Sequence, residues 1–397
     1  MDSFKHESYT HSNDTVRLKS FKKISKLFID SQIDSSLFYA QAMLAFAKEK
    51  QILYYISDAY DLISNVYEQK GELENCVASI DSAKYYANLI DDPVGVIYFA
   101  TNEGSTYIKM GRYFEALQCF EEMKNIGVKI NRPSRVAAAL NNIGAVYSKY
   151  GNYDEALEYH SKALQTSIIE NDDYNYLVAL INIGLDYDFL NDFNSSMEYY
   201  DKALKEAEKQ GDITSQAHVL ERMSSIYVEE NNFRKAKPLL KTALSISKTS
   251  GNKYDVASFS NSLGIIYLKE KNYEAALPIF NDALKVAKQI NASKIIADVY
   301  KSLTAYYYSS NNSEKAFNYQ KLSDVIRDSL YKAETDLKIA NLKNRFELNQ
   351  KLKELELIDI ELKSEKVISS DRLLIIYVVG ITGIVLLISL IYRHYRI

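Results

Sequence analysis

The chain has 397 residues and a formal net charge of −4, so its charge does not indicate a nucleic-acid-binding surface. Hydrophobic residues make up 47%, which is ample for a core, whereas 13 glycines and 4 prolines argue against an all-β fold and long linkers. The two cysteines, Cys76 and Cys119, lack metal-ligand spacing and are predicted to be small buried residues.

Residues 1–20 are predicted to form a polar N-terminal segment. They read MDSFKHESYTHSNDTVRLKS, with no apolar stretch and no small-residue cleavage site, so this segment is not a signal peptide as written. An export signal is therefore not visible in it.

Residues 21–330 contain a pattern that recurs every 40 residues. Each register has a small anchor residue and a tyrosine three residues later. The anchors are Ser64, Gly104, Gly144, Gly184, Ser224, Gly264 and Thr304. The tyrosines are Tyr67, Tyr107, Tyr147, Tyr187, Tyr227, Tyr267 and Tyr307. A fixed period of this kind is typical of proteins in which each unit packs on its neighbours.

Two further positions complete the pattern, and both hold mostly small residues. Twelve residues after the anchors come Cys76, Ala116, Ala156, Ser196, Ala236, Ala276 and Ala316. Nineteen residues after them come Ala83, Met123, Ala163, Ala203, Ala243, Ala283 and Ser323. Forty residues before the first members of these four series stand Ile24, Leu27, Ser36 and Met43. We interpret them as an eighth, degraded unit at the N-terminus.

Each unit is predicted to be a pair of helices. In the unit around Gly144, a helical pattern VAAALNNIGAVYSKY ends at Gly151, and YDEALEYHSKALQTS follows as a second helix. The equivalent stops are Gly71, Gly111, Asn191, Asn231 and Asn311, residue types that tolerate the left-handed conformation. Small residues allow the two helices to approach closely, while the tyrosine and the residue 16 after the anchor fill the larger gaps.

This order of residues resembles the tetratricopeptide repeat (TPR), in a variant with 40-residue units and long helices. The resemblance implies an all-α, right-handed solenoid of about eight helical hairpins over residues 21–330, with the first helices on its concave face. Serine or threonine replaces glycine at Ser64, Ser224 and Thr304, and the last unit also departs at Gln320 and Ser323. These departures concern local packing and leave the expected fold unchanged.

The resemblance also implies a groove for a peptide or protein partner. In the family, the position two residues before the anchor faces the groove. In this chain it is occupied by Asn102, Asn142, Asn182 and Arg222. Asn141, Lys149 and Lys109 are expected on the same inner surface. Asparagine offers a donor and an acceptor to a peptide backbone, and arginine suits a carboxylate. The alternative is that each asparagine bonds to the backbone of a neighbouring helix.

We expect no catalytic, metal or cofactor site and no enzymatic activity. The sequence contains no P-loop, G-x-S-x-G, HExxH or C-x-x-C motif. His160 and His218 lie in separate repeats, and each is interpreted as a packed or solvated side chain. The acidic pairs at Asp91–Asp92 and Asp172–Asp173 fall in turns between units, where aspartate is common.

Residues 331–370 are predicted to be a helical stalk. Leu348, Leu355 and Leu362 are spaced by seven, which favours a coiled coil and a homodimer through the stalk. A solvated helix lying on the last repeat is the alternative.

Residues 373–392 read LLIIYVVGITGIVLLISLIY and contain no charge, so they predict one transmembrane helix, followed by a basic tail over 393–397. Repeats, stalk and span in this order resemble membrane-anchored signalling proteins of Bacteroidetes. The resemblance implies a single-pass protein of the bacterial inner membrane with periplasmic repeats, whereas the absent signal peptide favours cytosolic repeats.

We therefore predict a non-enzymatic, membrane-anchored TPR protein that binds a peptide or protein, without direct nucleic-acid contact, as the sensor part of a signal-transduction system. The alternatives are a membrane-tethered assembly scaffold and a truncated sensor histidine kinase or LuxR-type regulator.

Overall fold

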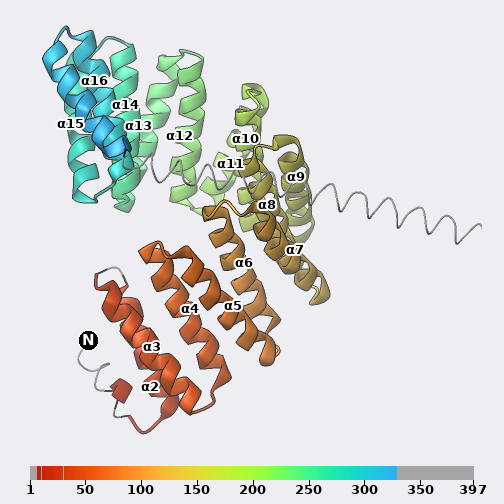
Figure 1. Ribbon diagram of the computed structural model, residues 1–397. Helices are drawn as coiled ribbons and strands as arrows, with labels where there is room; N and C mark the ends of the chain where they lie inside the picture. The colour runs from red at the N-terminus through yellow and green to blue at the C-terminus, as the bar shows by residue number, and fades with distance from the viewer. Residues whose placement is uncertain (1–6, 10, 30, 329–397) are drawn as a thin grey trace, which may run out of the picture. The chain divides into compact units, whose positions relative to one another are not determined.

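The computed structural model describes residues 7–9, 11–29 and 31–328, which form helices and short turns (Figure 1). The first helices of successive hairpins are α2 (Asp14–Phe28), α4 (Leu53–Lys70), α6 (Pro93–Lys109), α8 (Pro133–Tyr150), α10 (Asp173–Phe189), α12 (Ile213–Glu229), α14 (Lys253–Lys269) and α16 (Ser293–Ser309). The second helices are α3 (Ile33–Glu49), α5 (Leu73–Leu89), α7 (Tyr113–Lys129), α9 (Tyr153–Glu170), α11 (Phe193–Gln210), α13 (Phe233–Ser250) and α15 (Tyr273–Gln289), with a helix over 313–328 completing the last hairpin.

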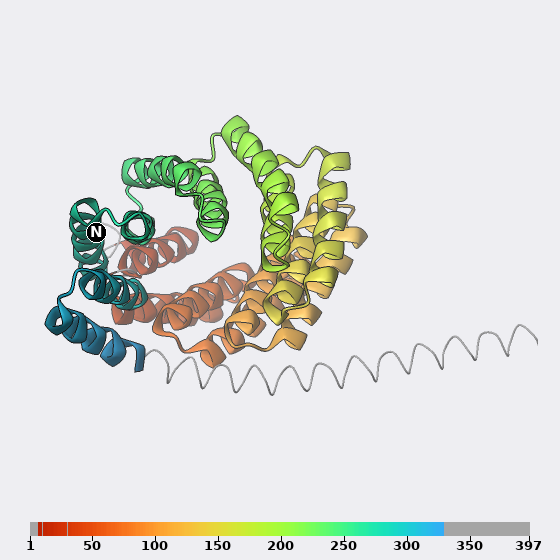
Figure 2. The ribbon, with the colours of Figure 1, turned by 90° about the horizontal axis from the view of Figure 1, so that it is seen from above.

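Each helix packs against the next one along the chain, both within a hairpin and between hairpins. Figure 2 shows the hairpins following one another in chain order from α2 to α16. The degraded N-terminal register is also a hairpin, formed by α2 and α3, in which Ile24, Ser36 and Met43 are fully buried. The 40-residue period of the sequence is thus the period of a helical hairpin.

The membrane part of the predicted architecture is corrected by the structure. Within residues 7–328, as far as they are described, no helix is long and apolar enough to cross a membrane. Helices α2 to α16 have only 15 to 18 residues and carry charged side chains, whereas a span needs about 20 apolar residues. The predicted span over 373–392, the stalk over 331–370 and the tail over 393–397 lie outside the described residues. The single-pass architecture and the inner-membrane localisation are therefore not supported, and an all-α array of helical hairpins replaces them.

The helix ends follow the predicted chemistry. All six predicted stops have positive φ, from 56° at Asn231 to 88° at Gly151. Pro93 and Pro133 are the first residues of α6 and α8, where a missing backbone N–H costs no hydrogen bond. Asp92 and Asp172 are N-caps, and each accepts a hydrogen bond from the backbone N–H three residues later.

Contact between the two helices of a hairpin depends on the anchor position. Opposite Gly104, Gly184 and Gly264 lie the rings of Phe120, Tyr200 and Phe280, and a Cβ atom added at these glycines would come within 2.5–2.6 Å of a ring carbon. At Gly144 the opposing ring is that of His160. Glycine is therefore required wherever the residue 16 positions later is aromatic.

The departures from glycine fit the same rule. The opposing register is the position 16 residues after the anchor. It holds Ile80 opposite Ser64, Leu240 opposite Ser224 and Gln320 opposite Thr304. None of these side chains is a ring, so a hydroxyl-bearing anchor is accommodated. Ser224 uses its hydroxyl to donate a hydrogen bond of 3.0 Å to the Ala236 carbonyl of the second helix.

The periodic tyrosines lie at the margin of the core and are partly buried. Tyr147 stacks on Tyr159 and Tyr187 on Tyr199, with ring centroids 5.4 and 5.7 Å apart. Burial is also the main cause that raises the pKa of Tyr147 to about 12. The two cysteines are buried and free, as predicted.

The pairing of anchor and opposing residue can be tested by exchanging one pair for another. Gly264→Ser should destabilise the protein by about 1–3 kcal/mol, because the added atoms meet the Phe280 ring. Phe280→Leu alone should cost a similar amount by opening a cavity. The double variant reproduces the Ser224–Leu240 pair and should recover at least about 1 kcal/mol of the summed loss. Thermal unfolding of the four proteins measures this, and simple additivity of the two losses would contradict the rule.

Candidate functional site

Six of the seven predicted binding residues, all except the buried Asn141, stand at two registers of the first helices that are seven residues apart and so share one side, which we call the first-helix face. Cavities open on this face between the first helices of neighbouring hairpins. One of about 510 Å³ lies between α4 and α6, and one of about 550 Å³ lies between α14 and α16. A smaller cavity of about 120 Å³ lies between α12 and α14. The first-helix face is therefore hollowed between α4 and α6 and again from α12 to α16.

The position two residues before the anchor faces these cavities. Asn102 lines the cavity between α4 and α6. Ser262 and Ser302, which occupy the same register, line the cavity between α14 and α16. Asn142 and Asn182 are half-buried at this register on α8 and α10. Of the predicted residues at this register, Asn102 lines one of these cavities, whereas Asn142, Asn182 and Arg222 line none of the three.

Arg222 lies on α12 with 49% of its side chain exposed. Its Nε atom is 3.8 Å from Glu221 Oε2. Burial raises the pKa of Asp188, whereas the positive charge of Arg222 acts to lower it. The guanidinium therefore already has carboxylates around it, and a ligand carboxylate would compete with them.

The two predicted lysines lie near the C-terminal ends of α6 and α8. Lys109 forms an ion pair with Glu68 of the preceding first helix, and Lys149 is exposed. Both share the register of Lys269, which lines the cavity between α14 and α16. These lysines therefore border the first-helix face.

Asn141 has a different environment from its neighbour Asn142. Its side chain is buried, and its Nδ2 atom donates a hydrogen bond of 3.3 Å to the carbonyl of Asn175 on α10. This is the alternative expected for asparagine, a bond to the backbone of a neighbouring helix. The amide of Asn141 thus joins α8 to α10.

A histidine–aspartate pair lies beside Asn141 in the core. His160 Nδ1 and Asp186 Oδ2 are 2.6 Å apart, and both side chains are 1% exposed. His160 Nε2 is 3.2 Å from the carbonyl of Asn141, so this nitrogen must carry a proton to donate there. His160 is a packed histidine, as predicted, whereas the sequence pattern did not indicate Asp186 as its partner.

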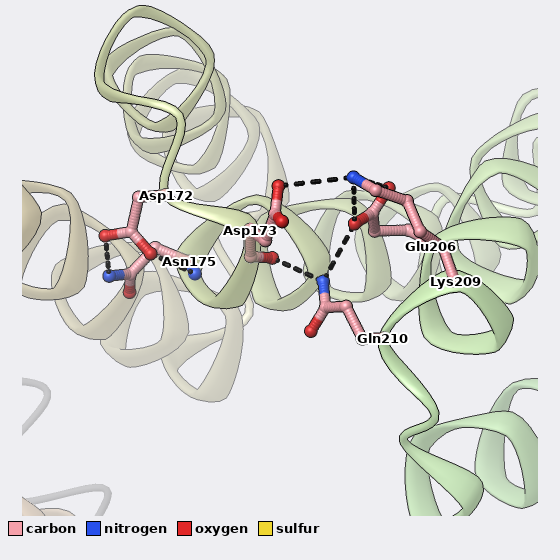
Figure 3. A network of polar contacts seen from close by, with 6 residues as sticks. All are labelled: Asp172, Asp173, Asn175, Glu206, Lys209 and Gln210. Atoms are coloured by element: carbon pink, nitrogen blue, oxygen red, sulfur yellow. Dashed lines mark hydrogen bonds and ion pairs between the residues drawn. The ribbon is translucent and has the colours of Figure 1, made fainter.

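A second polar network fixes the start of α10 (Figure 3). Asp172 accepts hydrogen bonds from the backbone and the side chain of Asn175 at 3.1 and 2.7 Å. Asn175 in turn donates to the carbonyl of Ser134 on α8 at 3.2 Å. At the other end of the network, Gln210 donates to the carbonyl of Asp173 at 2.7 Å and to Glu206 at 3.0 Å. These bonds hold α8, α10 and α11 together, and α8 and α10 carry Asn142 and Asn182.

The cavity between α4 and α6 contains residues that the register argument missed. Its wall includes Asp58 and Asp61 of α4 and Tyr98 of α6. Burial first, and the nearby Asp58 carboxylate second, raise the pKa of Asp61 to about 6, although a hydrogen bond from Tyr98 opposes the rise. Because aspartates on an amphipathic helix usually face solvent, the sequence alone gave no sign that this one would line a cavity.

In the part of the chain that the structure describes, no group of histidine, cysteine, aspartate or glutamate residues could hold a metal ion. Neither His160 nor Asp186 lines any of the three cavities of the first-helix face.

Helical hairpins of constant length, stacked through small anchor residues, define the class of α-helical repeat proteins. Tetratricopeptide-repeat family models match residues 97–167 and 135–209, and further repeats match at 217–250 and 257–290. The chain carries tetratricopeptide repeats, which confirms the predicted resemblance. No curated protein sequence matches the chain.

Several solved structures share the fold at low sequence identity. The quorum sensor NprR from B. thuringiensis, in its apo form, superposes with a TM-score of 0.55 at 18% identity, over 72% of this chain and 80% of that one. Aspartyl phosphate phosphatase F from Bacillus subtilis gives 0.54 at 14% identity, over 81% and 86%. A signal transduction ATPase with a tetratricopeptide repeat sensor, PH0952 from Pyrococcus horikoshii, gives 0.57 at 17% identity, over 85% and 53%.

The contribution of the His160–Asp186 pair to stability can be tested by replacing each member with the residue found at the same position in other units. His160→Phe, which copies Phe120 and Phe280, should destabilise the protein by about 3–5 kcal/mol, because Asp186 is left buried and unpaired. Asp186→Ile, which copies Ile226 and Ile266, should cost about 1–3 kcal/mol by leaving Nδ1 without a partner.

The double variant should be close to the wild type in stability, because no polar atom of the pair remains buried. Thermal unfolding, with hydrogen exchange of α9 and α10 as the local measurement, follows all four proteins. A double variant as unstable as His160→Phe alone would show that the pair is not the reason for the loss.

Proposed function

We propose that this protein acts by binding alone, as a sensor module that holds an extended peptide segment of a partner along the first-helix face. The observation that carries the proposal is that side chains of one register, Asn102, Ser262 and Ser302, line cavities between successive first helices. An extended chain crossing these helices would meet an equivalent polar side chain at each hairpin from α6 to α16, whereas α4 carries the buried Leu62 at this register.

The chemistry of the register suits a peptide backbone. The amides of Asn102, Asn142 and Asn182 each offer N–H donors and a carbonyl acceptor, which match the acceptors and donors of a peptide unit. Amide contacts of this kind recognise the backbone of many sequences. The side chains that line each cavity would then determine which residues of the partner are accepted.

The sensor role is supported by the fold alone. NprR is described as a quorum sensor and PH0952 as carrying a tetratricopeptide repeat sensor, and both superpose on this chain with TM-scores above 0.5. Their identities of 18% and 17% are too low to transfer a ligand. For this chain, sensing would consist of a change in hairpin packing when the peptide is bound.

An array of immobilised, N-acetylated and C-amidated decapeptides of random sequence tests peptide binding. The wild-type chain should be retained on a subset of the peptides. The triple variant Asn142→Ala/Asn182→Ala/Arg222→Ala should lose about tenfold or more in affinity for them, because each lost polar contact contributes about 1 kcal/mol.

The matched control is Asn125→Ala/Asn194→Ala/Arg234→Ala, which removes the same residue types from exposed positions on second helices. This variant should bind like the wild type. No retention of the wild-type chain would overturn peptide binding, and equal retention of both triple variants would overturn the first-helix face as its location.

A further inference from the structure

We propose that the cavity between α4 and α6 receives a lysine or arginine side chain of the bound peptide, with Asp61 as its counter-ion. This inference rests on the proposed function and adds a charge preference at one hairpin. It assigns to this cavity the selection of a basic residue of the partner. The acidic and aromatic residues of the cavity are separate from the asparagines that stand two residues before the anchors.

One carboxylate oxygen of Asp61 accepts no hydrogen bond from the described part of the chain. Asp61 Oδ1 is buried and has no hydrogen-bond partner among the described residues. A buried carboxylate oxygen that lacks a donor is energetically unfavourable, so such atoms are rare in folded proteins. An ammonium or guanidinium N–H entering the cavity would supply both the missing hydrogen bond and the opposite charge.

The other carboxylates of the cavity are already used. Asp92 accepts a hydrogen bond of 2.9 Å from the backbone N–H of Gly95, which it caps. Asp58 lies 2.6 Å from Lys22 Nζ, in an ion pair with α2. Arg135 of α8 also lines the cavity, and no ion pair in the described part joins it to Asp61. Asp61 interacts with Tyr98, but its Oδ1 atom has no partner and no ion pair of the described residues involves it, so it is the carboxylate left for a ligand cation.

The aromatic residues of the cavity favour a cation independently of the carboxylates. Tyr54 and Tyr98 both line it, and 53% and 47% of their surfaces remain exposed. Their ring faces attract ammonium and guanidinium groups, and tyrosine rings beside a carboxylate are a common setting for a bound cation.

Among the first helices, the only other carboxylate at the register of Asp61 is that of Glu221, which already accepts a hydrogen bond from Ser225 and lies 3.8 Å from Arg222 Nε. Asp61 lies three residues before its anchor, and the same register elsewhere holds Thr101, Asn141, Ile181, Glu221, Asn261 and Lys301. The corresponding cavity between α14 and α16 is lined instead by Lys269 and Lys301 together with Asp298. A basic side chain would therefore select the cavity between α4 and α6 and set the register of the peptide on the array.

Substitution within a retained peptide tests the inference. Starting from a decapeptide that the full wild-type chain binds, each arginine is replaced by citrulline, which has nearly the same shape without the charge. One replacement should weaken binding to the wild type by about tenfold or more, because a charge-assisted contact is lost. The same replacement should have little effect on Asp61→Asn.

Asp201→Asn is the control for charge, because it makes the same change at an exposed position of α11. This variant should discriminate arginine from citrulline as the wild type does. If Asp61→Asn keeps the preference for arginine, or if the wild type has none, the inference is overturned while the proposed function stands. If no peptide is retained, the proposed function fails and the inference fails with it. Circular dichroism of each variant confirms that it is folded.

The pH dependence gives a second test. The pKa of Asp61 is raised to about 6, so the carboxyl is ionised at pH 7 and mostly neutral at pH 5. The charged and titratable groups around it are Tyr54 and Asp58 on its own helix, Lys22 and Lys26 of α2, Asp92 at the start of α6, Tyr98 of α6 and Arg135 of α8. Affinity for the arginine peptide should fall about tenfold from pH 7 to pH 5, because only the ionised form binds the cation. The citrulline peptide and Asp61→Asn should show no such change, and equal pH dependence in Asp61→Asn would contradict the assignment.

Discussion

In the hairpins from α4 onward, the two helices approach closely because the first helix has little or no side chain at its anchor. A ring at the opposing register lies directly against the helix backbone at Gly104, Gly184 and Gly264, and that contact sets how the two helices are placed. Each second helix then packs on the next first helix, so the placement is passed from hairpin to hairpin. The cavities of the first-helix face lie between helices placed in this way, and the side chains that line them can vary without altering the frame.

The hairpin architecture could be predicted from the sequence because packing between neighbouring helices repeats. Gly144, Tyr147, Ala156 and Ala163 recur at the same spacing in other units, and a recurring set of sizes has a single simple explanation. The positive φ at Gly151 and its equivalents follows from the same pattern. The membrane-spanning architecture was predicted from one apolar stretch over residues 373–392, and no helix of the described residues is long and apolar enough to support it.

The candidate site was harder to predict, since environment rather than residue type decides the role of a polar side chain. Asn141 and Asn142 are adjacent and chemically identical, yet the first is buried against α10 and the second is half-buried at the cavity-facing register. Asp186 stands at a mostly apolar register and Asp61 at a mixed one, and neither register tells whether the carboxylate is exposed, paired or lining a cavity. In the structure each keeps one oxygen without a partner, but Asp186 is paired with His160 through its other oxygen, whereas Asp61 lines a cavity.

The His160–Asp186 pair also limits how the array can be rearranged. His160 belongs to the hairpin of α8 and α9, whereas Asp186 belongs to the next hairpin, so the pair crosses a boundary between units. Duplication, deletion or exchange of a single 40-residue unit at this point would separate the two and leave an ionisable group in an apolar core. The units are alike in backbone but are not interchangeable in order, and a shuffled array would remain intact only if these two hairpins moved together.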